Sequence, residues 1–243
     1  MPLLLEVQHL TKRFGGLTAV GDLSFGVAAG EILGLIGPNG AGKTTVVDLI
    51  SGVWRATSGS IAFEGEPVGH LLTFRRARSG IARTFQVMKP FRGLTTLDNV
   101  AVGALFGRRP ARELAGAREI AAECLRVVGL ERRASQRAND LGGPDRKRLE
   151  LAKALATQPK LLLLDEVMAG LNHAEIDEVI AIIRSLRDRG ITLIVIEHVM
   201  KAIQSLSDRV LVLHHGERIA EGPPAEVLAS PEVVEAYLGH RAR

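Results

Sequence analysis

A glycine-rich run near residue 40 has the residue types and spacing that bind nucleotide phosphates. It comprises Gly37, Pro38, Asn39, Gly40, Ala41, Gly42, Lys43 and Thr44, with Thr45 next in the chain. In this pattern of Gly, four residues, Gly, Lys and Ser/Thr, backbone N–H groups and a following helix N-terminus surround an anion. Lys43 is predicted to reach the β and γ phosphates, and the Thr44 hydroxyl to ligate Mg²⁺. The sequence therefore predicts nucleotide binding.

A pair of acidic residues supplies the second half of this chemistry. Asp165 and Glu166 directly follow the apolar run 161–164. A carboxylate that holds Mg²⁺ from the far side of a phosphate loop is expected at the carboxyl end of a neighbouring buried strand. We expect Asp165 to hold the metal through its water shell and Glu166 to polarise the attacking water as a general base. The pair therefore predicts nucleotide hydrolysis.

The elements that must position these residues alternate between strands and helices. The apolar runs 161–164 and 192–196 are each followed by a helical stretch, and the phosphate loop separates an apolar run from a helical pattern. This alternation predicts a parallel sheet with crossover helices, and hence an α/β fold. Short strands at 4–9, 23–27 and 31–36, separated by glycine-containing turns, predict an additional β region at the start.

The middle third of the chain has a different pattern. Apolar side chains recur at helical spacing at Leu114, Ala117, Ala121, Leu125 and Val128, which predicts a mostly helical insert. Prolines at 223, 224 and 231 mark two helix starts near the end. We therefore expect a single domain, 1–243. Its parts are an α/β nucleotide-binding core (1–87 and 157–222), a helical subdomain (88–156) and a short helical tail (223–243).

The composition excludes several classes of protein. Hydrophobic residues make up 46% and charged residues 24% of 243 residues, as in soluble globular proteins, so neither disorder nor a fibrous repeat is expected. The longest uncharged apolar runs are shorter than the roughly 18 to 20 residues of a transmembrane helix. The N-terminus lacks the features of a signal peptide, and the single cysteine, Cys124, excludes an intramolecular disulfide. A cytosolic location is therefore expected. The net charge is +4, but aromatic residues make up only 4%, so we expect no nucleic-acid partner.

Four further segments, together with these two motifs, resemble the ATP-binding subunits of ABC transporters over nearly the full chain. Gln86 resembles the family's Q-loop glutamine, which contacts Mg²⁺ and the attacking water and senses the transmembrane partner. His198 resembles the switch histidine that touches the γ-phosphate, and Phe14 lies where the family places an aromatic ring against adenine. The D-loop, which crosses to a second subunit, is resembled by Ala169, Gly170, Leu171 and Asn172.

Within that family, four stretches resemble the ATPases of branched-chain (hydrophobic) amino-acid importers. They are residues 83–86, 91–95, 197–201 and 236–239. Relatives that move urea, amides or lipopolysaccharide share parts of this set, so these cargoes remain alternatives.

The resemblance also implies a fold, cofactors and partners. The fold is a P-loop NTPase (RecA-like) core with an antiparallel β region and an inserted helical subdomain, and the cofactors are ATP and Mg²⁺. The partners are a second ATPase, identical or paralogous, then transmembrane permease subunits and, indirectly, a substrate-binding protein. The resemblance implies a peripheral location on the cytoplasmic face of the cell membrane.

One motif departs from the family pattern. The signature loop is usually Leu-Ser-Gly-Gly-Gln, and it opens a helix that faces the γ-phosphate held by the opposite subunit. Here the matching residues are Leu141, Gly142, Gly143, Pro144 and Asp145. The serine hydroxyl is lost at 142, and Pro144 has no N–H to donate. Because the two glycines keep their donors and Arg146 adds charge, we expect a working but altered site. The alternative is a subunit that hydrolyses ATP slowly or relies on a better signature loop in a partner ATPase.

Two rival readings and one metal site are not favoured. ABC-type ATPases of chromosomes or repair carry long coiled coils between the two motifs, and those of ribosomes carry two ATPase domains. This chain has one phosphate loop and a short interval between Lys43 and Asp165. His214 and His215 are adjacent in a strand-like segment, so their side chains are expected to point to opposite faces rather than to bind one metal. Trp54 and Cys124 are expected to be packing residues.

Overall fold

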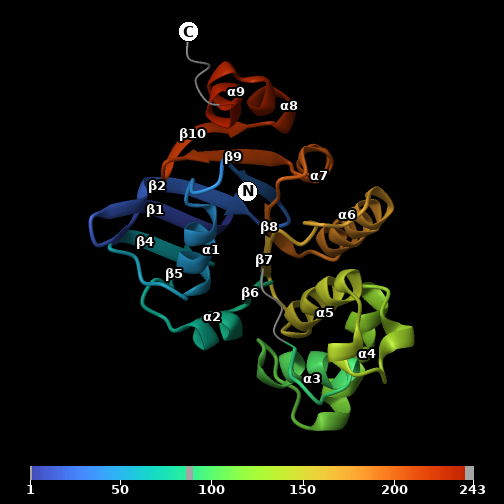
Figure 1. The fold of residues 1–243 in the computed structure, drawn as a ribbon. Coiled ribbons are helices and arrows are strands. Elements are labelled where there is room, and N and C mark those ends of the chain that lie inside the picture. The colour runs from blue at the N-terminus through green and yellow to red at the C-terminus, as the bar shows by residue number, and fades with distance from the viewer. Residues whose placement is uncertain (1, 86–89, 239–243) are drawn as a thin grey trace.

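The structure, a computed structural model, describes residues 2–85 and 90–238. Gln86, predicted as the Q-loop residue, lies outside the described residues. The described strands form a four-stranded sheet of order β2-β1-β4-β5 and a six-stranded sheet of order β10-β9-β3-β8-β7-β6. In Figure 1 the sheets form the centre of the molecule, with α3, α4 and α5 below them and α8 and α9 above. The expected α/β fold with an antiparallel region is confirmed.

The antiparallel sheet is built around a long hairpin. Its strands are β1 (Leu3–Phe14), β2 (Leu17–Ala28), β4 (Ser58–Phe63) and β5 (Glu66–Pro67). The first two are joined by the turn at Gly15 and Gly16. The strands expected at 4–9 and 23–27 are therefore parts of two twelve-residue strands. The hairpin is longer than expected. Its distal part is half-buried or exposed, so the apolar alternation that indicates a strand fades there.

The six-stranded sheet carries the elements of the nucleotide site. Its strands are β3 (Ile32–Ile36), β6 (Ile81–Arg83), β7 (Leu161–Asp165), β8 (Thr192–Ile196), β9 (Arg209–His214) and β10 (Glu217–Gly222). All pairs are parallel except β9 with β10. Every residue of β3, β7 and β8 is buried, because both faces of the sheet are covered.

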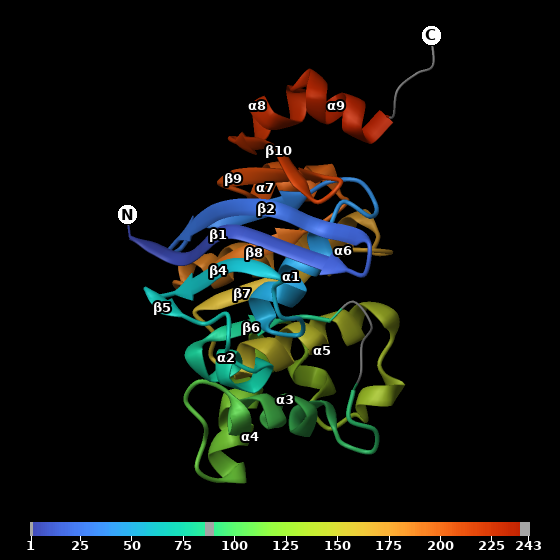
Figure 2. The same ribbon diagram turned by 90° about the vertical axis from the view of Figure 1, so that its left-hand side faces the viewer.

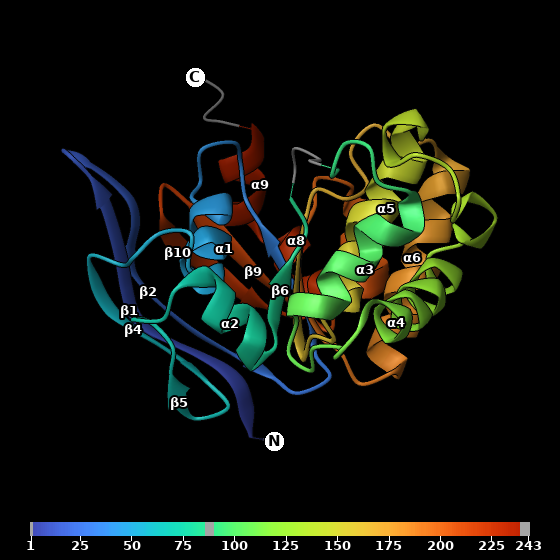
Figure 3. The ribbon, with the colours of Figure 1, turned by 90° about the horizontal axis from the view of Figure 1, so that it is seen from below.

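Alternate residues of these strands belong to two separate hydrophobic cores. Leu33 and Leu163 face the antiparallel sheet and α1 (Lys43–Ser51), whereas Ile32 and Leu162 face the core that the helices line. Figure 3 shows α1 between the two sheets, with α3 to α6 on the opposite side of the parallel sheet. The phosphate-loop helix is therefore enclosed by two sheets.

Helices make up most of the chain between the strands. They are α2 (Thr73–Ser79), α3 (Thr96–Phe106), α4 (Leu114–Val127), α5 (Gly143–Ala156), α6 (His173–Asp188), α7 (Met200–Leu206), α8 (Pro224–Ala229) and α9 (Pro231–Leu238), with 3₁₀ turns at Glu131–Arg133 and Ala138–Asp140. The helix starts expected from proline at 224 and 231 are present. None of the described helices combines the length and apolarity needed to cross a bilayer.

The apolar positions expected in the insert follow their predicted helical spacing. Ala117, Ala121, Leu125 and Val128 are buried, whereas Leu114 is half exposed at the start of α4. Cys124 is buried on the same helix, and burial raises its pKa to about 11. A thiol with this pKa stays protonated at neutral pH, which fits the expected packing role.

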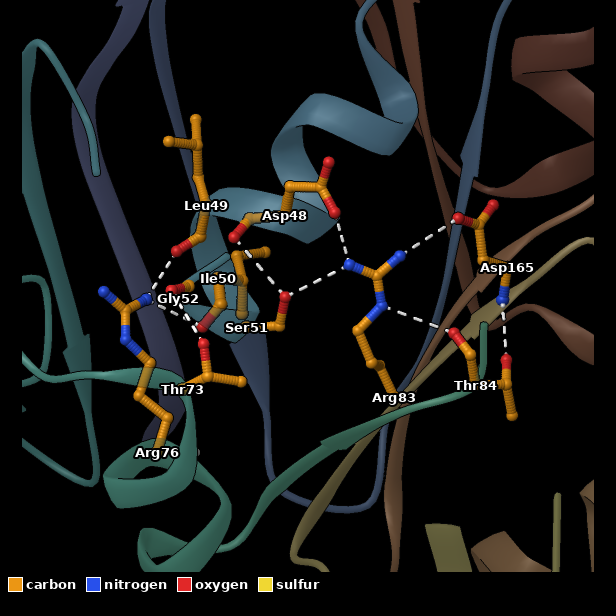
Figure 4. A network of polar contacts seen from close by, with 10 residues as sticks. All are labelled: Asp48, Leu49, Ile50, Ser51, Gly52, Thr73, Arg76, Arg83, Thr84 and Asp165. Carbon is orange, nitrogen blue, oxygen red and sulfur yellow. Dashed lines mark hydrogen bonds and ion pairs between the residues drawn. The ribbon is translucent and has the colours of Figure 1, made fainter. Parts of the chain in front are cut away.

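A fully buried arginine fixes the far end of the phosphate-loop helix. Arg76, on α2, is 1% exposed. Its guanidinium donates hydrogen bonds to the carbonyls of Leu49 and Ile50 in the last turn of α1, and to those of Gly69 and Leu71. Figure 4 shows Arg76 aimed at the α1 carbonyls. Helix C-terminal carbonyls lack intrahelical donors and favour a cation, so Arg76 acts as a cap, even though burial lowers its pKa.

We expect Arg76→Met to lower the free energy of unfolding by about 2 to 4 kcal/mol, because buried carbonyls lose their donor. Urea denaturation measures this change. The matched control is Arg75→Met, an exposed position on the same helix, which should change stability by no more than about 0.5 kcal/mol. Equal effects of the two substitutions would contradict the capping role.

Candidate nucleotide-binding and hydrolysis site

Close packing forces the path of the phosphate loop. Residues 37–42 connect β3 to α1. Gly37 has φ 150°, and a Cβ on it would lie 2.1 Å from the Leu213 carbonyl oxygen. Gly42 has φ 102°, and a Cβ there would lie 2.5 Å from the Ala19 carbonyl oxygen. Only glycine fits where the loop passes so close to the backbone of β9 and β2.

The lysine of the loop lies folded onto its own backbone. Lys43 is buried, and its Nζ donates to the carbonyl oxygens of Gly37 at 2.6 Å and Pro38 at 2.9 Å. Burial lowers the pKa of Lys43, and the nearby Glu166 and Asp165 carboxylates oppose that shift. A desolvated cation beside the free N–H groups of a helix N-terminus favours binding of a phosphate group.

The loop borders a pocket of about 540 Å³ that is large enough for a nucleotide. Predicted residues that line it are Phe14, Asn39, Gly40, Ala41, Gly42, Lys43, Thr44, Thr45 and Glu166. Gly37 and Pro38 do not line the pocket, but their carbonyl oxygens accept hydrogen bonds from Lys43, which does. The structure thus brings the expected ATP-binding residues other than Gly37 and Pro38 around one cavity.

The ring expected to face adenine is supported by a second aromatic residue. Phe14 meets Trp54 edge to face, with ring centroids 5.4 Å apart, and the Lys12 ammonium lies 4.8 Å from the Phe14 centroid. Trp54 is 47% exposed, so it packs against Phe14 beside the pocket rather than in the protein interior.

A histidine lines the same pocket and was missed in the sequence. His215 follows β9 and contributes to the lining. Its φ is 50°, so the strand alternation ends there, and its ring lies 4.1 Å from that of His214. The expectation that the two rings point to opposite faces is therefore wrong. Among the described residues, no group of three or more His, Cys, Asp or Glu side chains could hold a metal ion. The glycine after His215 was the available signal that the strand ends in a turn.

The two predicted catalytic side chains Glu166 and His198 touch each other. The parallel register pairs Asp165 of β7 with Ile196 of β8, so the two strands end side by side. His198 Nε2 lies 2.8 Å from Glu166 Oε1. Glu166 has φ 53°, and its N–H donates to the Ile196 carbonyl at 2.9 Å. Such left-handed backbone at a non-glycine residue costs free energy and is common in active sites. The contact fixes the direction of the Glu166 carboxylate.

Asp165 is held by a network that was not identified in the sequence. Its N–H donates to Thr84 Oγ1 at 3.2 Å, and its Oδ2 lies 3.5 Å from the Arg83 guanidinium, which also binds Asp48 and Ser51 of α1. Figure 4 shows Arg83 between Asp48 and Asp165. Burial raises the pKa of Asp165, and the charge of Arg83 opposes this shift. Arg83 therefore joins the phosphate-loop helix to the β7 carboxylate.

One oxygen of Asp165 is left for a ligand. Asp165 Oδ1 is buried and has no hydrogen-bond partner among the described residues. Buried polar atoms are nearly always satisfied, and a hydrated Mg²⁺ ion would supply the missing donor. Asp165 therefore fits the expected metal site, and Thr44, the second expected ligand, lines the pocket. The third expected ligand, Gln86, lies outside the described residues.

Hydrogen bonds hold the segment between Glu166 and α6. Glu197 is 1% exposed, and its Oε1 accepts a hydrogen bond from the Met168 N–H at 2.7 Å. The Lys147 ammonium donates to the Ala169 carbonyl. Asn172 and Glu175 form a capping box at the start of α6. The residues expected as the D-loop, Ala169 to Asn172, thus follow β7 and lead into α6, and Lys147 of α5 contacts them. Neither the role of Glu197 nor that of Lys147 in holding this segment was predicted from the sequence.

The residues of the altered signature loop lie outside the pocket lining. Leu141 is buried, Gly142 is the N-cap of α5 and Pro144 lies in the first turn, as expected. Asp145 Oδ2 lies 3.7 Å from Arg133 Nε. The Arg146 guanidinium donates to the carbonyls of Leu141 and Asn139, each at 2.8 Å. The Arg146 guanidinium, which we expected to add charge to the site, therefore binds backbone carbonyls of its own chain.

Two models of known protein families match this chain. A family model described as "ABC transporter" matches residues 20–169. A second, described as "Branched-chain amino acid ATP-binding cassette transporter", matches residues 217–243.

Curated relatives match nearly the whole length. The chain is 39% identical over 252 residues to the high-affinity branched-chain amino acid transport ATP-binding protein BraF of Pseudomonas aeruginosa, covering 97% of this chain and 98% of that protein. It is 40% identical over 249 residues to the corresponding protein LivG of Salmonella typhimurium, with 97% and 98% coverage.

Solved structures of similar proteins have the same fold. A nucleotide-free ATP-binding cassette from an ABC transporter aligns with a TM-score of 0.89 at 28% identity, covering 98% of this chain and 100% of that one. An ABC transporter cassette in its ADP conformation aligns with a TM-score of 0.88 at 29% identity, with 99% and 100% coverage. A dimeric cassette in a post-hydrolysis state, bound to ADP and Pi, gives a TM-score of 0.82 at 25% identity, with 90% and 98% coverage.

We expect stability to depend on pH through Glu197. Burial raises its pKa from 4.5 to about 7, and the repulsion of Glu166 adds to this, whereas the Met168 N–H and Lys147 oppose it. The folded state therefore keeps the proton at pH values where the unfolded chain has lost it, so stability falls as pH rises from about 4.5 to about 7. Glu197→Gln keeps the acceptor for Met168 but cannot ionise. Relative to the parent it should gain on the order of 2 to 3 kcal/mol between pH 5 and pH 8.

Urea denaturation at both pH values measures this gain. The control is Glu64→Gln, which removes a surface carboxylate paired with Lys160, outside the buried contact between Glu197 and Met168. A Glu197→Gln difference that is the same at pH 5 and pH 8 would show that this carboxyl does not titrate as proposed.

Proposed function

We propose, from the fact that this chain belongs to the ABC transporter family of ATP-binding cassettes, that it is the ATPase of an importer for branched-chain amino acids. The chain is an ATP-binding cassette with ATPase activity, and nucleotide binding is a property of its family. The observation that carries the cargo class is the full-length similarity to branched-chain amino acid transport proteins, together with the match of residues 217–243 to a branched-chain model. Importers of urea or amides and lipid transporters remain alternatives, because cargo is recognised by other subunits.

The pocket supports a specific placement of ATP. The backbone N–H groups of residues 39–44 surround the β and γ phosphates, and Lys43 leaves the carbonyls of its loop to contact them. Phe14 faces the adenine ring. Thr44, Asp165 and Gln86 are the proposed holders of Mg²⁺. When bound, Mg²⁺ neutralises the charge on the transferred phosphoryl group.

Glu166 and His198 are proposed to act together in hydrolysis. Glu166 orients a water molecule and accepts its proton as the water oxygen bonds to the γ-phosphorus and the bond to the ADP oxygen breaks. The His198 ring, 2.8 Å from Glu166 Oε1, holds that carboxylate in place and stabilises the γ-phosphate.

The site is proposed to be completed by a second cassette in a head-to-tail pair, identical or paralogous. Support comes from the dimeric structures of similar cassettes and from the position of residues 141–145 outside the chain's own pocket. In the pair, this signature loop faces the partner's ATP and residues 169–172 cross between the subunits.

The remaining proposed partners belong to the membrane. We place this chain on the cytoplasmic face of the cell membrane, where transmembrane permease subunits contact its Gln86 region. A substrate-binding protein acts through those permease subunits. Supporting this location, the relatives are named as transport ATP-binding proteins. We also propose the division into an α/β core, a helical subdomain at 88–156 and a tail at 223–243.

Steady-state ATPase rate against protein concentration tests the proposal. The rate should rise more steeply than linearly, because the active unit is a pair. Glu166→Gln should bind ATP as tightly as the parent but hydrolyse it at least about 100-fold more slowly, because a general base is lost. The surface variant Glu64→Gln should keep the parent rate. Normal turnover in Glu166→Gln would remove Glu166 from the base role.

Restoring the signature loop tests the altered motif. The double variant Pro144→Gly with Asp145→Gln adds a backbone donor and removes a negative charge at the N-terminus of α5, where the partner's phosphate approaches. We expect kcat to rise by about 3- to 10-fold, the effect of one added hydrogen bond to a charged group. ATP affinity of the free subunit should not change, since these residues lie outside its pocket. A parent and double variant that both bind ATP without hydrolysing it would favour the alternative that a paralogous partner is required.

A further inference from the structure

One side chain of the C-terminal tail reaches the phosphate loop. Tyr237, on α9, is 38% exposed, and its hydroxyl oxygen accepts a hydrogen bond from the Gly37 N–H at 2.8 Å. The two residues are 200 positions apart in the chain. Helix α9 packs on β10 and buries Val233 in the helical core. Figure 2 shows α8 and α9 forming a separate layer above β10.

The position of this bond matters because Gly37 begins the loop. Its N–H is bound to Tyr237, and its carbonyl oxygen is bound to Lys43 Nζ at 2.6 Å. The close approach to the Leu213 carbonyl already restricts this residue. When Lys43 turns to a phosphate group, Gly37 and Pro38 lose their contact with the ammonium. The tyrosine hydroxyl then remains as a restraint on the first peptide of the loop.

We propose that the C-terminal tail is coupled to nucleotide occupancy, with Tyr237 as a positioning residue that preorganises the phosphate loop through Gly37. This inference rests on the proposed binding of ATP by that loop. Burial raises the pKa of Tyr237, and the hydrogen bond from the Gly37 N–H opposes this shift. Coupling between two binding events is reciprocal. If docking of α9 strengthens ATP binding by some factor, ATP strengthens docking of α9 by the same factor.

The substitution Tyr237→Phe isolates this bond, because it keeps the ring and removes only the oxygen. We expect the dissociation constant for ATP, measured by calorimetry in the Glu166→Gln background, to rise about two- to tenfold, as expected for loss of one hydrogen bond. The unfolding midpoint without nucleotide should fall slightly, because the Gly37 N–H loses its acceptor in the free protein as well. The matched control is Val234→Ala, an exposed position on the same helix, which should leave the dissociation constant unchanged.

Hydrogen exchange gives the reciprocal readout, which a merely structural role would not alter. Saturating ATP should slow amide exchange in residues 231–238 of the Glu166→Gln protein by the same factor, and should not slow it when Tyr237→Phe is added. Unchanged or tighter ATP binding in Tyr237→Phe would overturn the inference, as would exchange in α9 that ignores ATP in the parent. Failure of the parent to bind ATP would instead contradict the proposed function.

Discussion

The parallel register of three buried strands determines where the chemistry of this protein occurs. The strands β3, β7 and β8 run side by side and end at one edge of the sheet. The phosphate loop follows β3, the Asp165 and Glu166 pair ends β7, and His198 follows β8. Groups far apart in sequence therefore meet because apolar strands bury both faces. The 2.8 Å contact between Glu166 and His198 is a direct consequence of this register.

Charges at that edge are held in an incompletely satisfied state. Burial lowers the pKa of Lys43 and raises that of Asp165, so both charged forms are disfavoured where they stand. Each is partly compensated within the chain, Lys43 by loop carbonyls and Asp165 by Arg83. Asp165 Oδ1 still lacks a partner among the described residues. The proposed ligands, a nucleotide phosphate and a hydrated divalent cation, would supply the opposite charges and the donors that this arrangement lacks.

Local pattern sufficed to predict the loop, the β7 carboxylates and the alternation of strands and helices, because each depends on neighbours in the chain. The role of His198 was implied only by the family resemblance, and its contact with Glu166 was not predicted. Arg83 and Glu197 were not identified, because their partners are backbone groups or carboxylates on other elements, and no spacing rule encodes these. His215 was misjudged because one left-handed residue ends the strand alternation.

The phosphate loop and the signature loop, which we propose faces a partner subunit, differ in how many contacts hold them. The loop and α1 are restrained at entry by Gly37 and Tyr237, at exit by Arg76, and along one side by Arg83. The signature loop starts at the N-terminus of α5, where Gly142 and Gly143 are exposed. In the proposed pair, a phosphate loop held by several contacts meets a solvent-exposed signature loop with an altered sequence, and we infer that catalysis depends most on how the two subunits meet. We therefore propose that the departures at 144 and 145 act on closure of the proposed pair, whereas the restraints on α1 act on the ATP affinity of one subunit.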